Sequence, residues 1–243
     1  KSLLYFPIEE DNPFFGWRGI CLTLDHPKIF LAQVRAMLKA NEGLWNLRIM
    51  LPMVCNIAEL DEALELIRRS HRELLQDGLK GTLPPIGVMV EVPAAVYMAR
   101  AMARRVDFLS VGSNDLTQYL LAVDRNNARV AGLYDSLHPA VLKALRDVAV
   151  ASRAEQVPIG ICGELAGEPG GAVLLLAMGY DVLSMNATSL PRVKKALRNL
   201  RLSEARDLLE EVMAMEYGID ISRRLEEFLA AHGMENFIHS PVE

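Results

Sequence analysis

The sequence predicts an α/β fold built on a parallel β-sheet, and three observations support this prediction. Short, mostly apolar stretches alternate with longer segments whose apolar residues recur at helical spacing. Gly and Pro residues separate many of these stretches. The strand candidates are apolar along most of their length, as in parallel sheets covered by helices. Six strand–helix units are visible, and both an open doubly wound sheet and an eightfold (β/α) barrel agree with this pattern.

The first half of the chain begins irregularly and then predicts three strand–helix units. Residues 1–17 contain several Pro and Gly residues and predict no regular element. Asn56 with Glu59 three residues later predicts a capped helix start, and Pro93 suits the first turn of the next helix. The strands are expected at 18–24, 47–53 and 86–90, and the helices at 26–40, 56–78 and 93–105.

The second half predicts three more units and then helices alone. Pro139 begins one helix, Gly179 ends another, and Ser189 caps the helix that follows. No Gly-rich dinucleotide fingerprint or P-loop follows any strand, which weakens the nucleotide-binding versions of the open sheet. The strands are expected at 106–111, 159–162 and 182–185, the helices at 116–123, 139–156 and 170–178, and two further helices from Ser203 onward, broken at Gly218 and Gly233.

Composition and charge narrow the class of protein. A length of 243 residues with 51% apolar residues suits one large domain, so we expect residues 1–243 to form a single domain. A net charge of -5 argues against a nucleic-acid partner, and no apolar run is long enough to span a bilayer. The cysteines Cys21, Cys55 and Cys162 are odd in number, scattered and without zinc-type spacing. This usage fits a reducing cytoplasm better than a disulfide framework.

Residues 106–125 hold the densest group of candidate site residues. An apolar strand ends near Gly112, and Ser113, Asn114 and Asp115 stand between it and the next helix. Parallel α/β folds place their chemistry at the carboxyl ends of strands. Backbone N–H groups at a helix start bind anions, and an Asp beside them is a ligand for a hard metal ion. The stretch therefore predicts a phosphorylated substrate bound with Mg²⁺, and the alternative is a simple helix cap.

Other polar residues follow other strands. Glu91 and Asp115 on neighbouring strands can share one Mg²⁺, although a structural ion pair is the alternative for Glu91. Arg125 and Arg18 either hold a phosphate or carboxylate with the planar guanidinium or lie on the surface. Cys162 ends a strand and is either a small core residue or a thiol acid facing a substrate.

Five motifs, spread along the chain, identify a family. They are Asn-Pro-Phe-Phe-Gly-Trp-Arg-Gly at 12–19, Gly-Val-Met-Val-Glu-Val-Pro-Ala-Ala at 87–95, Ser-Val-Gly-Ser-Asn-Asp-Leu-Thr-Gln-Tyr at 110–119, Ala-Val-Asp-Arg at 122–125 and Ile-Cys-Gly-Glu-Leu-Ala-Gly at 161–167. With these motifs nearly the whole chain resembles Enzyme I, the phosphoenolpyruvate–protein phosphotransferase of the bacterial phosphotransferase system. Residues 133–140 and 184–186 are more similar to its nitrogen-related branch than to its sugar-transport branch.

The resemblance implies a phosphoenolpyruvate-binding (β/α)₈ barrel that uses Mg²⁺. Glu91 and Asp115 would hold the metal ion. Arg18 and Arg125 would grip the charged groups of phosphoenolpyruvate. These roles agree with the ones that the residue types and their positions predict.

The resemblance also implies the remaining chemistry and the partners. Asn114, with backbone N–H groups near Ser113 and Asp115, would donate hydrogen bonds to the substrate. Cys162 would protonate the methylene carbon of the enolate once the phosphoryl group has left. The phosphoryl acceptor would be a histidine on a separate domain, which in turn serves a phosphocarrier protein. A homodimer is expected.

The sequence departs from the family at the start of its barrel. The family's first two barrel strands each carry a substrate-binding arginine, and neither strand has a counterpart here. We therefore expect a fragment of a larger multidomain protein, inactive by itself as a phosphotransferase, because two charge-assisted contacts of roughly 1.5–3 kcal/mol each are missing. The alternatives are a barrel of pyruvate phosphate dikinase or phosphoenolpyruvate synthase, and a dimerising module that senses a metabolite.

Overall fold

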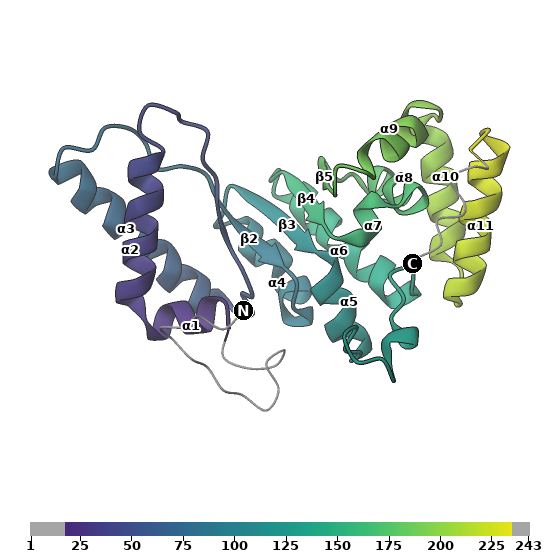
Figure 1. The fold of residues 1–243 in the computed structure, drawn as a ribbon, viewed down its shortest axis with the longest axis horizontal. Helices are drawn as coiled ribbons and strands as arrows, with labels where there is room; N and C mark the ends of the chain where they lie inside the picture. Colours follow the sequence, from purple (N-terminus) through teal and green to yellow (C-terminus); the bar gives the residue numbers. More distant parts are fainter. Residues whose placement is uncertain (1–17, 235–243) are drawn as a thin grey trace.

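The structure, a computed structural model, describes residues 18–234 and has a five-stranded parallel sheet at its centre (Figure 1). Each strand pairs with the next one in the chain, so the order is β1-β2-β3-β4-β5. In a doubly wound sheet the order of the strands reverses at an inner strand. In a (β/α) barrel each strand lies next to the following one in the chain, as here. The strands are β1 (Ile49–Leu51), β2 (Ile86–Val90), β3 (Phe108–Gly112), β4 (Ile159–Cys162) and β5 (Val182–Ser184). The predicted α/β class and the barrel topology are confirmed.

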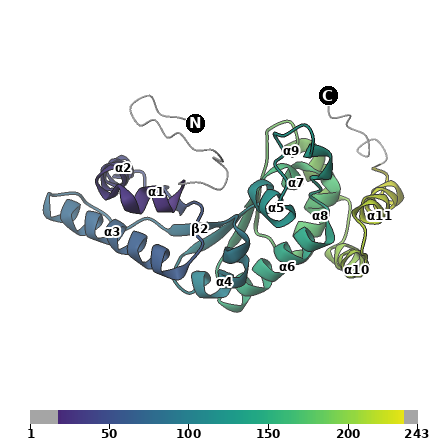
Figure 2. The same cartoon turned by 90° about the horizontal axis from the view of Figure 1, so that it is seen from below.

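Helices connect the strands and extend the molecule at both ends. Figure 2 shows α3, α4 and α6 in a row along one side of the sheet, with α1 and α2 near one end of the molecule and α10 and α11 at the other. The helices are α1 (Ile20–Asp25), α2 (Pro27–Ala40), α3 (Ile57–Gln76), α4 (Pro93–Ala103), α5 (Ser113–Leu121), α6 (Pro139–Ala154), α7 (Glu164–Gly167), α8 (Pro169–Met178), α9 (Leu190–Arg198), α10 (Leu202–Met213) and α11 (Gly218–Ala231), with a 3₁₀ turn η1 (Ala131–Leu133). No helix within residues 18–234 is both long and apolar enough to cross a bilayer.

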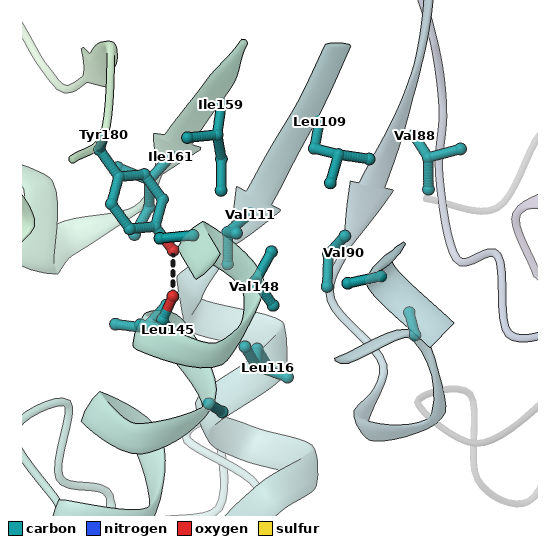
Figure 3. Packing of buried hydrophobic residues seen from close by; sticks show 14 of the residues in the cluster. Val88, Val90, Leu109, Val111, Leu116, Leu145, Val148, Ile159, Ile161 and Tyr180 are labelled. Carbon is teal, nitrogen blue, oxygen red and sulfur yellow. Dashed lines mark hydrogen bonds between the residues drawn. The ribbon is translucent and has the colours of Figure 1, made fainter. Parts of the chain in front are cut away.

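The two faces of the sheet differ in burial. One face packs against the helices and buries Ile49, Leu51, Val88, Val90, Leu109, Val111, Ile159 and Ile161. Figure 3 shows strand residues of this face near Leu116 and Val148, and the hydroxyl of Tyr180 donates to the carbonyl of Leu145 at 3.0 Å. The alternate residues are half-buried, exposed or glycine, and Met50 is 39% exposed. This second face corresponds to the interior of a closed barrel.

The sheet does not close within the described residues. β1 pairs only with β2, and β5 pairs only with β4, so both edges carry unpaired backbone groups there.

The prediction of a strand at 18–24 is wrong, because this segment contains helix α1, and the described sheet has five strands rather than six. The apolar residues Ile20, Leu22 and Leu24 alternate as in a strand, but so short a run does not distinguish a strand from a helix. Contacts with α2 and α3, which bury Ile20 completely, decide the conformation. The predicted irregular start at 1–17 lies outside the described residues.

The other five strands agree closely with their predicted ranges, but helix α5 begins earlier than predicted. It begins at Ser113 instead of Leu116, because Gly112 is both the last residue of β3 and the N-cap of the helix. The helix start therefore contains Asn114 and Asp115 in its first turn.

Helix α8 packs so closely against α7 that it requires glycine at position 171. Nearly every residue of α8 is buried. A Cβ added at Gly171 would lie 2.5 Å from the backbone oxygen of Leu165. A backbone atom cannot move aside as the end of a side chain can, so the helices would have to separate.

We predict that Gly171→Ala destabilises the chain by about 1–3 kcal/mol, as overpacking does. In an open helix the same change would stabilise by up to about 1 kcal/mol, so the sign of the effect is informative. Urea unfolding followed by circular dichroism measures it. Gly132→Ala, at a position with open space, is the matched control. Equal or higher stability of Gly171→Ala would contradict the close packing.

Candidate active site

The register of the parallel sheet brings the predicted site residues to one edge. Val90 of β2 pairs with Val111 of β3, and Gly112 pairs with Cys162 of β4. Glu91 directly follows Val90, so its side chain and Cys162 lie on either side of Gly112. Because parallel strands end at the same edge of a sheet, the residues that follow β2, β3 and β4 meet there.

Glu91 is a buried carboxyl group with one backbone donor. It is 4% exposed, and the N–H of Met53 donates to its Oε1 at 2.8 Å. Burial, aided by the nearby Asp115, raises the pKa of Glu91 to about 7, although the Met53 N–H and Arg18 oppose this rise. Gly112 leaves the space for this side chain, since a Cβ there would lie 2.9 Å from Oε2 of Glu91.

The Glu91–Asp115 pair fits a divalent cation of the Mg²⁺ type. Asp115 is close enough to raise the pKa of Glu91, so the two negative charges repel unless a proton or a cation lies between them. Within residues 18–234 no group of three or more His, Cys, Asp or Glu side chains is arranged to hold a metal ion. Two carboxylates suffice for Mg²⁺, which commonly takes its other ligands from water and substrate phosphates.

Ser113 and Asn114 occupy the first turn of α5 and bind the segment that follows β4. The Ser113 hydroxyl donates to the carbonyl of Cys162 at 3.0 Å. The side-chain oxygen of Asn114 accepts from the backbone N–H of Glu164 at 3.1 Å and from the hydroxyl of Tyr134 at 3.5 Å. Both contacts use the oxygen, so the NH₂ group of Asn114 is the part oriented to donate elsewhere.

The two predicted arginines approach from different segments. Arg18 precedes α1, and its guanidinium donates to the hydroxyl of Tyr119 at 3.5 Å. Arg125 follows α5, where its backbone N–H donates to the side-chain oxygen of Gln118 at 3.4 Å. Burial raises the pKa of Tyr134, and the charge of Arg125 partly opposes this. The charge of Arg18 thus acts on Glu91, and that of Arg125 on Tyr134.

Cys162 lines a hollow of ≈ 290 Å³ at the ends of β4 and β5. Asn114, Glu164 and residues 184–186 also line it. Burial raises the pKa of the Cys162 thiol, and the charges of Glu91 and Asp115 raise it further. The thiol is therefore protonated near neutral pH, which is the state that an acid needs.

Another hollow, of ≈ 340 Å³, lies at the opposite ends of the strands, next to Pro158 and Asp181. The guanidinium of Arg153 in its wall donates to the carbonyl of Met178 at 2.7 Å, and the Asp181 carboxylate accepts from the N–H of Ile159 at 2.8 Å. These polar groups are already bonded to backbone groups of the fold. The candidate active site is therefore better placed at the carboxyl ends of the strands.

Sequence reasoning missed two tyrosines and the contact that the backbone of Glu164 makes. Tyr119 follows Asp115 by four residues, so helical spacing could have placed both on one face. Tyr134 comes from the segment between α5 and α6, and no local signal connects it with Asn114. Glu164 contributes its backbone N–H, a group that side-chain patterns do not reveal.

We predict that Glu91→Gln stabilises the chain at pH 8 by up to about 3 kcal/mol when divalent cations are absent. The folded-state pKa of Glu91, about 7, exceeds the usual value of 4.5. The folded state therefore binds more protons between these pH values, and wild-type stability falls as pH rises through this window. The advantage of Gln should shrink toward pH 5.

Urea unfolding at pH 5 and pH 8 tests this prediction, with the exposed Glu210→Gln as control. A stability difference that is the same at both pH values would refute the raised pKa.

Comparisons with known proteins agree with this geometry. Residues 1–202 match the family model described as PEP-utilising enzyme, PEP-binding domain. A protein of Escherichia coli (strain K12) named phosphoenolpyruvate-dependent phosphotransferase system is 48% identical over 239 residues, which are 98% of this chain and 32% of that protein. A phosphoenolpyruvate-protein phosphotransferase of Haemophilus influenzae is 42% identical over 236 residues, covering 96% of this chain and 41% of that protein. This chain thus spans less than half the length of either relative.

A solved structure supports the fold. The crystal structure of a citrate lyase from Burkholderia xenovorans LB400 matches with a TM-score of 0.53 and 19% identity, over 84% of this chain and 69% of that chain. At this identity the likeness concerns the fold alone. From the family match and the arrangement of the strand ends together, we conclude that the chain belongs to the family of PEP-binding domains of PEP-utilising enzymes.

Proposed function

We propose that this chain is the catalytic, phosphoenolpyruvate-binding part of a phosphotransferase that moves the phosphoryl group to a histidine on a separate domain and releases pyruvate. The buried Glu91 carboxyl group, paired with the half-buried Asp115 and near the protonated Cys162 thiol, is the observation that carries this proposal. A dikinase or synthase barrel would share the site, but the relatives named above are phosphotransferases. The nitrogen-related branch stays a prediction.

Substrate binding rests on the charged groups around the strand ends. Mg²⁺ held by Glu91 and Asp115 would supply positive charge for the phosphate and enolate oxygens. Arg18 and Arg125 would bind the anionic ends of the substrate. The NH₂ group of Asn114 and the backbone N–H groups of the first turn of α5, which begins at Ser113, would donate to its oxygens.

Proton transfer rests on Cys162. Loss of the phosphoryl group leaves an enolate whose methylene carbon must gain a proton to become pyruvate. The thiol keeps its proton near neutral pH because burial and two carboxylates disfavour the thiolate. Cys162 would donate this proton, and the hollow that it lines would hold the methylene end of the substrate.

The wider assembly is also a proposal. The histidine-bearing domain, the phosphocarrier protein, the homodimer and the cytoplasmic location come from the resemblance to Enzyme I and from composition. A single domain over residues 1–243 likewise stays a prediction.

We predict that phosphoenolpyruvate binds this chain in the presence of Mg²⁺ and that Arg125→Ala weakens binding about 10- to 100-fold, the effect of losing one charge-assisted contact. Amide NMR titration measures affinities into the millimolar range. Arg206→Ala, an exposed change on α10, should bind like wild type. Binding that is equally strong with a chelator present would contradict the metal assignment.

We also predict that the chain exchanges the methyl protons of pyruvate for deuterium in D₂O with Mg²⁺, because protonation of the enolate is reversible. Cys162→Ala should slow this exchange at least about a hundredfold, which is typical for the loss of a general acid or base. Proton NMR of the methyl signal follows the reaction. Cys55→Ala is the control that removes a different thiol. Exchange by Cys162→Ala at the wild-type rate would exclude Cys162 as the acid.

A further inference from the structure

Two thiols outside the strand-end site converge on one carboxylate. The sulfur of Cys21 lies 3.8 Å from Oε1 of Glu59. The sulfur of Cys55 lies 3.4 Å from the same oxygen and 3.3 Å from Oε2. Both thiols therefore donate to the same group, and both sulfurs are free and partly exposed.

The backbone fixes this cluster. Glu59 stands in the first turn of α3, where its Oε2 accepts from the N–H of Asn56 at 3.3 Å and from that of Cys55 at 3.2 Å. The side-chain oxygen of Asn56 accepts from the N–H of Glu59 at 2.9 Å, which completes a capping box. Cys55 belongs to the loop between β1 and α3, whereas Cys21 belongs to α1, so the cluster joins two segments.

The environment keeps both sulfurs in the thiol form. Burial raises the pKa of Cys55 to about 11, and the hydrogen bond and charge of Glu59 contribute to this. Burial, Glu59 and Asp25 raise the pKa of Cys21. Because the thiolate is the species that reacts with peroxide, these raised pKa values slow the oxidation of both sulfurs at neutral pH.

We propose that Cys21 and Cys55 form a disulfide on exposure to a peroxide. One sulfur attacks the O–O bond of hydrogen peroxide, which gives a sulfenic acid and one water. The second thiol then attacks this sulfur, the S–S bond forms, and the sulfenic oxygen leaves as a second water with the remaining proton. Two thiols and one peroxide thus become one disulfide and two waters.

The disulfide would link the two segments that meet beside the proposed substrate site. Arg18 precedes Cys21 by three residues, and a Cβ on Gly19 would lie 2.5 Å from Cβ of Met53. Met53 in turn donates its N–H to Glu91. A disulfide requires the sulfurs to approach to about 2.05 Å, so it would tether α1, and with it the neighbouring Arg18, to the β1–α3 loop. This second step, the tethering of Arg18, rests on the proposed function.

Peptide mapping tests the disulfide directly. The chain is treated with hydrogen peroxide, remaining thiols are blocked with N-ethylmaleimide, and the digest is analysed by mass spectrometry. A peptide pair joined through Cys21 and Cys55, lost after dithiothreitol, is expected, with Cys162 blocked by the reagent. No such pair, or equal yields of pairs that contain Cys162, would overturn the proposal.

Matched variants sharpen the test. Glu59→Gln keeps the acceptor of the capping box but removes the negative charge, so the thiols should ionise more readily and the disulfide should form several-fold faster. Glu62→Gln, exposed on the same helix, should form it at the wild-type rate. Cys21→Ser should form none while keeping its circular dichroism spectrum. Equal rates for the two Glu variants would overturn the role of Glu59.

Binding separates the two steps. Phosphoenolpyruvate with Mg²⁺ should bind the oxidised chain about tenfold more weakly than the reduced one, and dithiothreitol should restore affinity. Peroxide should leave the affinity of Cys21→Ser unchanged. A disulfide without a change in affinity would refute the link to Arg18. Failure of the reduced chain to bind would refute the proposed function, whereas the mapped disulfide would stand.

Discussion

The parallel pairing of β2, β3 and β4 is the constraint on which the candidate site depends. One set of alternate strand residues, including Val88 and Val111, is buried against helices. This burial fixes the register, and the register places Glu91 on the opposite face, beside Gly112 and Cys162. A slip by one residue would move apolar side chains out of the core and turn Glu91 toward the helices. The hydrophobic core therefore positions the carboxyl group without contacting any substrate.

Two glycines allow the backbone to lie close to the polar side chains of the site. A Cβ at Gly112 would crowd the Glu91 carboxylate, and a Cβ at Gly163 would lie 2.1 Å from the Ser113 hydroxyl and 2.9 Å from the side-chain oxygen of Asn114. Gly163 also has a φ of 129°, which other residues rarely adopt. Two glycines at the ends of adjacent strands thus let three polar side chains come together where β-carbons would keep them apart.

The sequence predicted the parts of this structure that local patterns encode. The apolar runs of β2 and β4 were sufficient to place those strands, and their ends pointed to Glu91 and Cys162. Tertiary contacts decided the rest. Burial of Ile20 between helices makes α1 a helix despite its alternating pattern. The contact of Tyr134 with Asn114 spans 20 residues and has no local signal. The contacts of Cys21 and Cys55 with the same carboxylate, that of Glu59, could not be predicted either, because the cysteines are far apart in the sequence.

The electrostatics of the site connect the proposed metal ion and the proposed acid with the surrounding pH. Glu91 binds a proton with a pKa near 7 because burial and Asp115 both disfavour its charge. A cation on the pair must therefore displace this proton, so cation affinity should rise with pH up to about neutrality. The same two charges raise the pKa of Cys162. A cation that neutralises these two carboxylates would therefore lower the pKa of the Cys162 thiol, because coupling between two binding sites is reciprocal. Cation binding at the carboxylates would thus make Cys162 a stronger acid, as the proposed protonation of an enolate requires.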